Sequence, residues 1–176
     1  MRAPFPIFVS QRRLGSSGFT LAEVLIAIAV SVIFAGAAFT TNERLLVALK
    51  SQKETTAATM VLQQRMETFR ATAFSNIATA SYVQGSIVAN ATGSEAPLGN
   101  LTETVTISSY APADGSTPTV VQRNSANPTG TIVSTNANLA NSTLVRVDVL
   151  LSWTSANSRS RSRQLSSIFG IGNIAP

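Results

Sequence analysis

Cysteine and histidine are both absent from this chain of 176 residues. Their absence excludes disulfides, thiol nucleophiles, imidazole bases and zinc sites of the Cys/His kind. Charged residues are scarce, at 12%, whereas apolar residues make up 44%. This composition suits an exported protein with a polar but weakly charged surface. We therefore do not expect an enzyme, and we expect no catalytic, cofactor-binding or metal-binding residues.

The excess of basic residues is smaller than the total suggests. There are 13 basic and 8 acidic residues, but Arg2, Arg12 and Arg13 precede a long apolar run. Processing of the N-terminus would remove these three and leave 10 basic residues against 8 acidic ones. The one dense basic group, 159–163, is a weak signature of nucleic-acid binding, so no nucleic-acid partner is expected.

The apolar run extends from Phe19 to Phe39 and contains one charged residue, Glu23. As a helix, its roughly 21 residues would be long enough to cross the hydrocarbon core of a bilayer. Positive charge before the run predicts that the N-terminus stays in the cytoplasm and that the C-terminus lies outside. We expect a single membrane span.

Three interpretations of this run are open. A secretory signal peptide would be cleaved at the small residues Ala35–Ala37, but its apolar region usually has only about 7 to 15 residues. An uncleaved signal anchor explains the length and the orientation but leaves Glu23 without a role, and a carboxylate within a membrane span usually has one. The third interpretation comes from the flanking residues.

The stretch GFTLAE, residues 18–23, resembles the N-terminal signature of type IV pilins and type II secretion pseudopilins. The shared features are a basic leader that ends in glycine, an aromatic first mature residue, and a glutamate at the fifth mature position. Ala22 stands where the family usually has a larger aliphatic residue. The resemblance implies a leader over residues 1–18, cleavage between Gly18 and Phe19 by a prepilin peptidase, and N-methylation of Phe19.

The resemblance also implies a role for Glu23 in assembly. The new amine of Phe19 would be largely cationic near neutral pH, because the reference pKa of an α-amine is about 7.7 to 8.0. Glu23 of the same or a neighbouring subunit would be its counter-ion in a medium that screens charge weakly. The alternative is a lone buried acid that stays protonated.

No proline occurs between Phe19 and Ala96, and helix-forming residues continue beyond the apolar run, so the helix is predicted to reach about Phe74 or Ile77. Residues 19–40 would be its membrane half and residues 41–77 its extracytoplasmic amphipathic half. Two apolar stripes face nearly opposite ways on that second half. We interpret one stripe as a contact surface for neighbouring helices and the other as the surface that docks on a head, although both could be core stripes of one bundle. The first stripe is Leu46, Leu49, Ala57 and Met60; the docking stripe is Leu62, Met66, Phe69 and Ala73.

Residues 78–176 are predicted to form a β-rich head. The strongest strand is Thr143–Trp153, where apolar and polar residues alternate, and Arg159–Phe169 would follow it across a turn at 156–158. Tyr82–Ala89 and Leu101–Tyr110 are earlier candidates. The low-complexity segment 111–142 is interpreted as a long surface loop, with short β-like pieces at 119–122 and 131–134. Within it, Asp114 is interpreted as part of an Asp-Gly turn rather than a calcium ligand.

The C-terminal hairpin resembles the closing hairpin of minor pilins and small pseudopilins, without the usual turn glycine. The predicted fold class is therefore α+β, with a long N-terminal helix packed on a small antiparallel sheet. The resemblance implies a structural subunit of a type IV pilus or type II secretion filament, held first in the bacterial inner membrane. Implied partners are the prepilin peptidase, other pilins or pseudopilins, an inner-membrane platform protein and membrane lipid. The alternative is a signal-anchored extracytoplasmic binding module that never polymerises.

Overall fold

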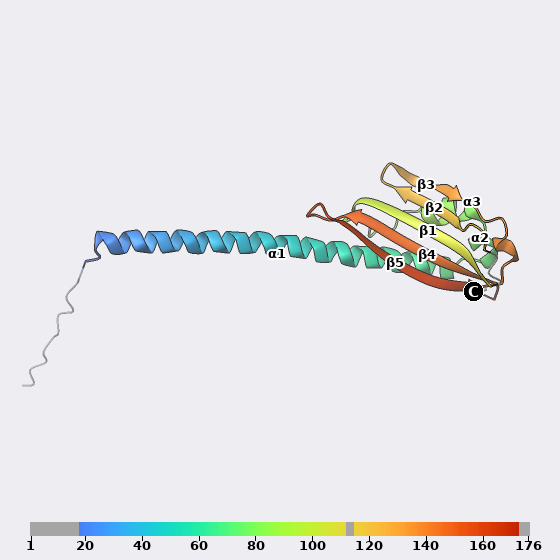
Figure 1. Cartoon of the computed structure of the whole chain (residues 1–176), viewed down its shortest axis with the longest axis horizontal. Helices are drawn as coiled ribbons and strands as arrows, with labels where there is room; N and C mark the ends of the chain where they lie inside the picture. Colours follow the sequence, from blue (N-terminus) through green and yellow to red (C-terminus); the bar gives the residue numbers. More distant parts are fainter. Residues whose placement is uncertain (1–17, 112–114, 173–176) are drawn as a thin grey trace, which may run out of the picture. The chain divides into compact units, whose positions relative to one another are not determined.

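The computed structural model describes residues 18–111 and 115–172 (Figure 1). Two units make up the chain, Met1–Glu43 and Arg44–Pro176. The first unit holds the beginning of helix α1, and the second holds the rest of α1 together with the other elements. In chain order these elements are α1 (Leu21–Arg70), α2 (Phe74–Ile77), α3 (Ala80–Tyr82), the π-helix η1 (Val83–Val88), β1 (Gly99–Ala111), β2 (Thr119–Asn124), β3 (Asn127–Ser134), the 3₁₀ helix η2 (Leu139–Asn141), β4 (Leu144–Thr154) and β5 (Ser160–Gly170).

Helix α1 is 50 residues long and begins close to where the apolar run begins. It ends at Arg70, earlier than the sequence predicts, because Ala73 adopts an extended conformation (φ −59°, ψ 143°) that caps α2. The break turns the chain so that Phe74 and Ile77, on α2, are buried in the head. The predicted continuation of one helix through residue 77 is therefore wrong, although residues 74–77 are helical.

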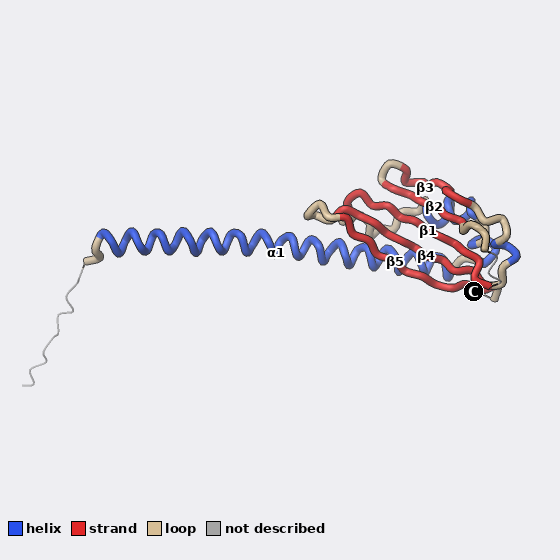
Figure 2. The backbone as a smooth tube through the Cα atoms, in the orientation of Figure 1, coloured by secondary structure: helices blue, strands red, loops and turns tan. Residues whose placement is uncertain are grey.

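The head contains one antiparallel sheet of five strands in the order β3-β2-β1-β4-β5 (Figure 2). Its register is shown by one row of paired residues, in which Val121 lies opposite Val105, Val105 opposite Val149, and Val149 opposite Leu165. The strand predicted at 143–153 is β4, and its alternating residues are buried on one face and more exposed on the other. The α+β fold class is confirmed.

The core lies between the second half of α1 and one face of the sheet, and α2 and η1 contribute further side chains. Phe69 on α1 and Phe169 on β5 place their ring centroids 6.2 Å apart, so the helix also contacts the edge strand. Burial of these apolar side chains is the main force that holds the helix on the sheet. The largest contributors from α1 and the sheet are Val61, Leu62, Met66, Phe69, Val105, Ile107, Val147, Val149, Leu151, Trp153 and Phe169.

Two predictions about the head are wrong. Residues 82–89 form helical turns rather than a strand, because Val83, Ile87 and Val88 recur at helical spacing and are all buried. The segment 111–142 is not one long loop, since it contains strands β2 and β3, which pair with each other and extend the sheet. The β-like pieces predicted at 119–122 and 131–134 lie within these two strands. The sequence signal of β2 is weak because its inward positions, Thr119, Val121 and Arg123, include only one apolar residue.

Candidate functional site

The predicted cleavage bond lies just before the first turn of α1. Gly18, Phe19 and Thr20 have no regular secondary structure, and all three are exposed. A Cβ at Gly18 would meet no atom within 4 Å, so nothing in the described structure requires glycine there. The bond between Gly18 and Phe19 is therefore accessible, and any demand for glycine would come from the enzyme that cuts it. Residues 1–17 of the predicted leader lie outside the described residues.

Thr20 and Glu23 bind each other across the first turn of α1. The backbone N–H of Thr20 donates to Oε2 of Glu23 at 2.9 Å, and the Thr20 hydroxyl donates to the same oxygen at 3.0 Å. The backbone N–H of Glu23 in turn donates to Oγ1 of Thr20 at 3.3 Å. This reciprocal arrangement is a capping box, which satisfies N–H groups that a helix leaves unpaired at its start. The pattern Thr-x-x-Glu at residues 20–23 is the sequence signal for this capping box.

The capping box places the carboxylate of Glu23 at the helix end where negative charge is favoured. An ionised carboxylate has about four acceptor positions, so it can accept further hydrogen bonds beyond those from Thr20. The nitrogen of Phe19, which cleavage would convert to an amine, belongs to the residue directly before Thr20. Glu23 can therefore both start the helix and lie near a new positive charge.

One face of α1 continues from this site along the apolar run. Phe19, Glu23, Ala27, Ser31 and Ala35 line a shallow groove on that face. All of them are exposed in the single chain, as are the large apolar side chains on the other sides of the run. Among the described residues, α1 is the one helix long and apolar enough to cross a membrane. Lipid or other helices would have to cover this apolar surface in water.

Only part of the predicted docking stripe is buried against the head. Leu62, Met66 and Phe69 are buried in the head core, but Ala73 is exposed and lies beyond the end of α1. Ala73 therefore does not dock the helix, because the break after Arg70 turns it outward. Of the opposite stripe, Leu46, Leu49 and Met60 are exposed, whereas Ala57 is buried with the core. Ala57 is thus wrongly assigned to the outer surface.

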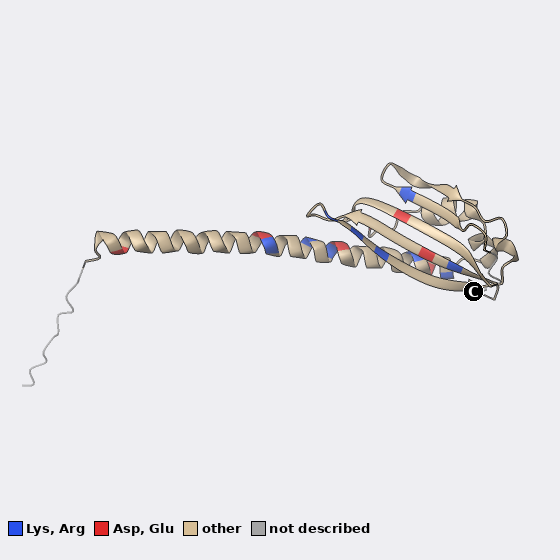
Figure 3. Cartoon of the chain, in the orientation of Figure 1, with Lys and Arg blue, Asp and Glu red and all other residues tan. Residues whose placement is uncertain are grey.

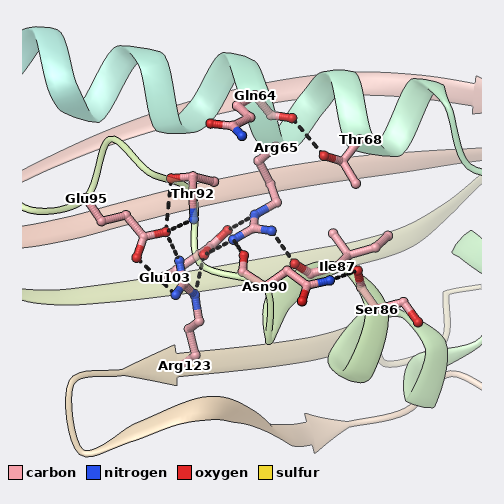
Figure 4. A network of polar contacts seen from close by, with 10 residues as sticks. All are labelled: Gln64, Arg65, Thr68, Ser86, Ile87, Asn90, Thr92, Glu95, Glu103 and Arg123. Carbon is pink, nitrogen blue, oxygen red and sulfur yellow. Dashed lines mark hydrogen bonds and ion pairs between the residues drawn. The ribbon is translucent and has the colours of Figure 1, made fainter.

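A buried ionic network that the sequence did not indicate joins α1 to the sheet (Figure 4). Arg65 on α1 donates to both carboxylate oxygens of Glu103 on β1, at 2.6 and 2.9 Å. Arg123 on β2 donates to Glu103 at 2.7 Å and also pairs with Glu95. Arg65 further donates to the backbone carbonyl groups of Ile87 and Asn90. The network leaves no free group for catalysis, so we assign it a structural role.

The charges in this network support one another. Burial alone would raise the pKa of Glu95, but the hydrogen bonds and charge of Arg123, together with donors on Thr92, outweigh burial and lower this pKa. Burial likewise opposes the positive charge of Arg123, yet Glu95 and Glu103 raise its pKa overall. Both shifts favour the ionised forms of Glu95 and Arg123. The sequence could not have paired the charges of this network, because Arg65 and Arg123 lie 38 and 20 residues from Glu103.

A second polar contact fastens the β4–β5 turn to α1. The carboxylate of Glu54 is buried and accepts hydrogen bonds from the Ser155 hydroxyl at 2.5 Å and from the Ala156 N–H at 2.8 Å. Burial alone would raise the pKa of Glu54, but these donors, the nearby indole of Trp153 and the charge of Arg161 lower it. In the described part of the chain, the indole N–H of Trp153 is buried without a hydrogen bond of normal geometry.

The turn lies at residues 156–158, as the sequence predicts. The N–H of Ser155 donates to the carbonyl of Arg159, and Ser158 has a φ of 60°. Serine thus occupies a left-handed position of the kind that glycine adopts most easily.

No group of three or more metal-ligating side chains of the His, Cys, Asp or Glu type occurs within residues 18–111 and 115–172. Asp114 lies outside the described residues, although the adjacent Gly115 has a φ of 63°. We therefore find no basis in this part of the chain for placing a metal ion.

Residues 13–39 match the family model described as the prokaryotic N-terminal methylation motif. The match covers 27 of the 176 residues and contains Gly18, Phe19 and Glu23. No curated protein and no solved structure matches the chain. The motif is of the prepilin type, and it indicates a protein that a prepilin peptidase processes. Together with the apolar helix α1, it also indicates a single membrane anchor.

Proposed function

We propose that this chain, a type IV pilin-like protein by its motif and its long N-terminal helix, is a structural subunit of a filament. The subunit is a minor pilin or pseudopilin, and the filament is a type IV pilus or a type II secretion pseudopilus. The observation that carries the proposal is the methylation motif at 13–39, which overlaps the start of an apolar helix with no cover of its own. The chain does no chemistry itself.

Processing is the first step of this function. A prepilin peptidase cuts the accessible bond between Gly18 and Phe19 and methylates the new amine of Phe19. The capping box of Thr20 and Glu23 supports the residues that follow the cut, because it satisfies the first N–H groups of α1. After cleavage, Phe19 is the new first residue, and it directly precedes Thr20, which caps the helix.

Assembly is the second step. Before assembly the subunit is anchored by residues 19–40, with the head outside the inner membrane, and a platform protein in that membrane delivers it to the growing filament. The cationic amine of Phe19 then pairs with Glu23 of its own or a neighbouring subunit. An unpaired charge among apolar helices costs several kcal/mol, so this pair selects the correct arrangement of the helices.

The extracytoplasmic part of α1 supplies a second contact surface. Leu46, Leu49 and Met60 are exposed large apolar side chains that the head does not cover. Neighbouring helices in a filament would bury them, and this burial would add to the packing of the membrane halves. In a module that never polymerises, this apolar stripe outside the membrane would stay exposed to water.

The deciding experiment is the intact mass of the protein purified from the membranes of its own host. We expect a chain that starts at Phe19 and carries one added methyl group. A chain that starts at Ala38 would indicate a secretory signal peptide, and an intact Met1 would indicate a signal anchor; either result contradicts the proposal. Crosslinking between purified subunits then separates a filament subunit from a processed module that stays single.

A further inference from the structure

Charges on the head are distributed unevenly. The described residues include ten basic side chains, and four of them, Arg65, Arg70, Arg123 and Arg146, form ion pairs with carboxylates. The other six make no ion pair within the described part of the chain. These six, which we call the basic end, are Arg44, Lys50, Lys53, Arg159, Arg161 and Arg163.

The basic end is formed by two segments far apart in the sequence. Arg44, Lys50 and Lys53 lie on α1, whereas Arg161 and Arg163 lie at the start of β5 and Arg159 directly precedes it (Figure 3). Glu54 joins the two segments through its hydrogen bonds with Ser155 and Ala156 in the turn before β5.

The fold places four of these charges, those of Lys50, Lys53, Arg159 and Arg161, near that junction. Arg161 is near enough to Glu54 for its charge to lower the pKa of that carboxyl. Lys50 and Lys53 line a hollow of about 350 Å³ together with Thr154 and Ala156. Lys50, Lys53 and Arg159 are exposed. Glu54, already bonded by two donors, is the one acid at this junction within the described residues.

A second copy of this chain offers little to neutralise the basic end. On the described head, Glu95 and Glu103 are buried in the ionic network, and Glu54 is bound to the β4–β5 turn. Glu67 and Asp148 are more exposed, but they already pair with arginines of their own. Glu43, exposed on α1 directly before Arg44, is one acid against six basic side chains. The anionic partner of the basic end is therefore a different kind of molecule.

The position of the basic end in the chain indicates what its anionic partner is. Arg44 follows the apolar run by only a few residues, and Lys50 and Lys53 come within the next three turns of the same helix. Basic residues close to a membrane surface are attracted to any anionic lipid that the facing leaflet contains, and the attraction fades with distance from the surface. We propose that the basic end of the head binds the anionic phospholipid headgroups of the membrane that holds α1.

This binding would hold the head at the membrane before assembly, and the inference rests on the membrane anchoring of α1. Its strength falls with salt, because the surface potential of a membrane is screened within about one Debye length, roughly 8 Å at physiological ionic strength. Extraction of the subunit into a filament would then have to break these contacts as well as those of the apolar run.

The absence of cysteine allows a direct test with the full chain. Asn157→Cys places one thiol at the exposed tip of the β4–β5 turn. The protein is reconstituted into vesicles of phosphatidylcholine, with or without 30 mol% phosphatidylglycerol, and outward-facing heads are labelled with a membrane-impermeant fluorophore. A quencher attached to lipid headgroups reports how close the turn lies to the surface.

We expect stronger quenching in the vesicles that contain phosphatidylglycerol, and we expect added salt to reverse the increase. Lys50→Gln/Lys53→Gln should weaken head binding and remove most of the increase, because both side chains belong to the basic end. Arg70→Gln/Arg146→Gln is the matched control, because it removes the same number of positive charges from exposed sites outside the basic end. Circular dichroism of each variant verifies folding.

Equal quenching in the two kinds of vesicle would overturn the inference and would favour an acidic protein as the partner. An equal loss of quenching in the control variant would also overturn it, because net charge rather than the basic end would then be responsible. A folded chain that does not incorporate into vesicles would contradict both this inference and the membrane anchor. A chain that incorporates but shows no lipid dependence contradicts the inference alone.

Discussion

Arg65 on α1 and Glu103 on β1 form a buried bidentate ion pair between residues 38 positions apart in the sequence. The pair specifies one position of the helix along the sheet, since a shift by one residue would bury Arg65 without a carboxylate and leave Glu103 with Arg123 alone. Apolar packing alone tolerates such shifts more easily, because the hydrophobic effect has no direction. The helix that carries the predicted assembly site is therefore fixed to its head by charge as well as by packing.

Replacing Arg65 by Ala should destabilise the head by about 3 to 5 kcal/mol, the usual cost of breaking a buried ion pair from one side. The change leaves Glu103 with Arg123 alone and removes the donor for the carbonyl groups of Ile87 and Asn90. Denaturant unfolding of the full chain in detergent measures the effect. Arg70→Ala breaks an exposed pair and should cost less than about 0.5 kcal/mol; equal losses would show that the network has no special role.

Met66→Asp and Phe69→Asp should each destabilise the head strongly, by more than about 3 kcal/mol, because they place a charge in the apolar core. Met60→Asp is the matched control on the opposite side of the same helix, where the side chain is 52% exposed. Thermal melting of the three variants compares them. Similar melting temperatures for Met60→Asp and Met66→Asp would contradict the assignment of the docking stripe.

A fragment that begins at Thr41 and ends at Pro176 should be soluble and folded. It lacks the apolar run but keeps Leu62, Met66 and Phe69 together with the whole sheet. Gel filtration and circular dichroism without detergent test this expectation. An aggregated fragment would indicate that the exposed stripe of Leu46, Leu49 and Met60 needs cover even in the single subunit.

Substitutions at Glu23 separate its two roles. Glu23→Val removes both the cap and the charge, and Glu23→Gln keeps a side chain that can accept from Thr20 but removes the charge. If the counter-ion role holds, both variants should be cleaved after Gly18 and inserted in the membrane, yet neither should co-purify with sheared filaments. Glu23→Asp, with its shorter reach, should be partly active.

Thr20→Ala completes this comparison, because it removes the hydroxyl of the capping box and keeps the charge of Glu23. We expect it to assemble, with a loss of about 1 kcal/mol at the helix start. Normal assembly of Glu23→Gln together with failure of Thr20→Ala would show that Glu23 acts as a cap and not as a counter-ion.

Acid should weaken the contact between α1 and the β4–β5 turn. The hydrogen bonds and the Arg161 charge lower the pKa of Glu54 in the folded state against the effect of burial. The resulting stability is therefore present above the unfolded pKa of about 4.3 and is lost as the pH falls through the lower folded value. We expect the difference in melting temperature between the unaltered chain and Glu54→Gln to shrink below about pH 4. Ser155→Ala removes one donor, so it should make that difference smaller at neutral pH.

The features that could be predicted are those with a strong local pattern. α1 has an uninterrupted run of helix-forming residues, and the alternation in β4 is complete, with Val145, Val147, Val149, Leu151 and Trp153 all buried. The leader junction is a local motif of the same kind. The residues within each of these segments are enough to predict its structure, so the tertiary contacts need not be known.

The missed features depend on contacts that are distant in the sequence. For β2 the sequence indicates only a short piece at 119–122, because the strand places Arg123 at an inward position. The partners Glu103 and Glu95 make this buried arginine compatible with a core. The turn after Arg70 is decided by the burial of Phe74 and Ile77, which helix propensity does not describe. The capping box of Thr20 and Glu23 is different, because both residues lie within one turn of the helix. From the sequence, Glu23 is interpreted only as a charge in the membrane, so its role as a helix cap is not predicted.

Trp153 gives the head an intrinsic optical reporter at the contact between α1 and the β4–β5 turn. It is the single tryptophan of the chain, it is 3% exposed, and its indole lowers the pKa of the adjacent Glu54. Its emission should lie at short wavelength while the turn is fastened to α1, and it should move to longer wavelength when water reaches the indole. Opening of this junction could thus be followed in real time, in the native chain and without a dye, as the subunit leaves the membrane.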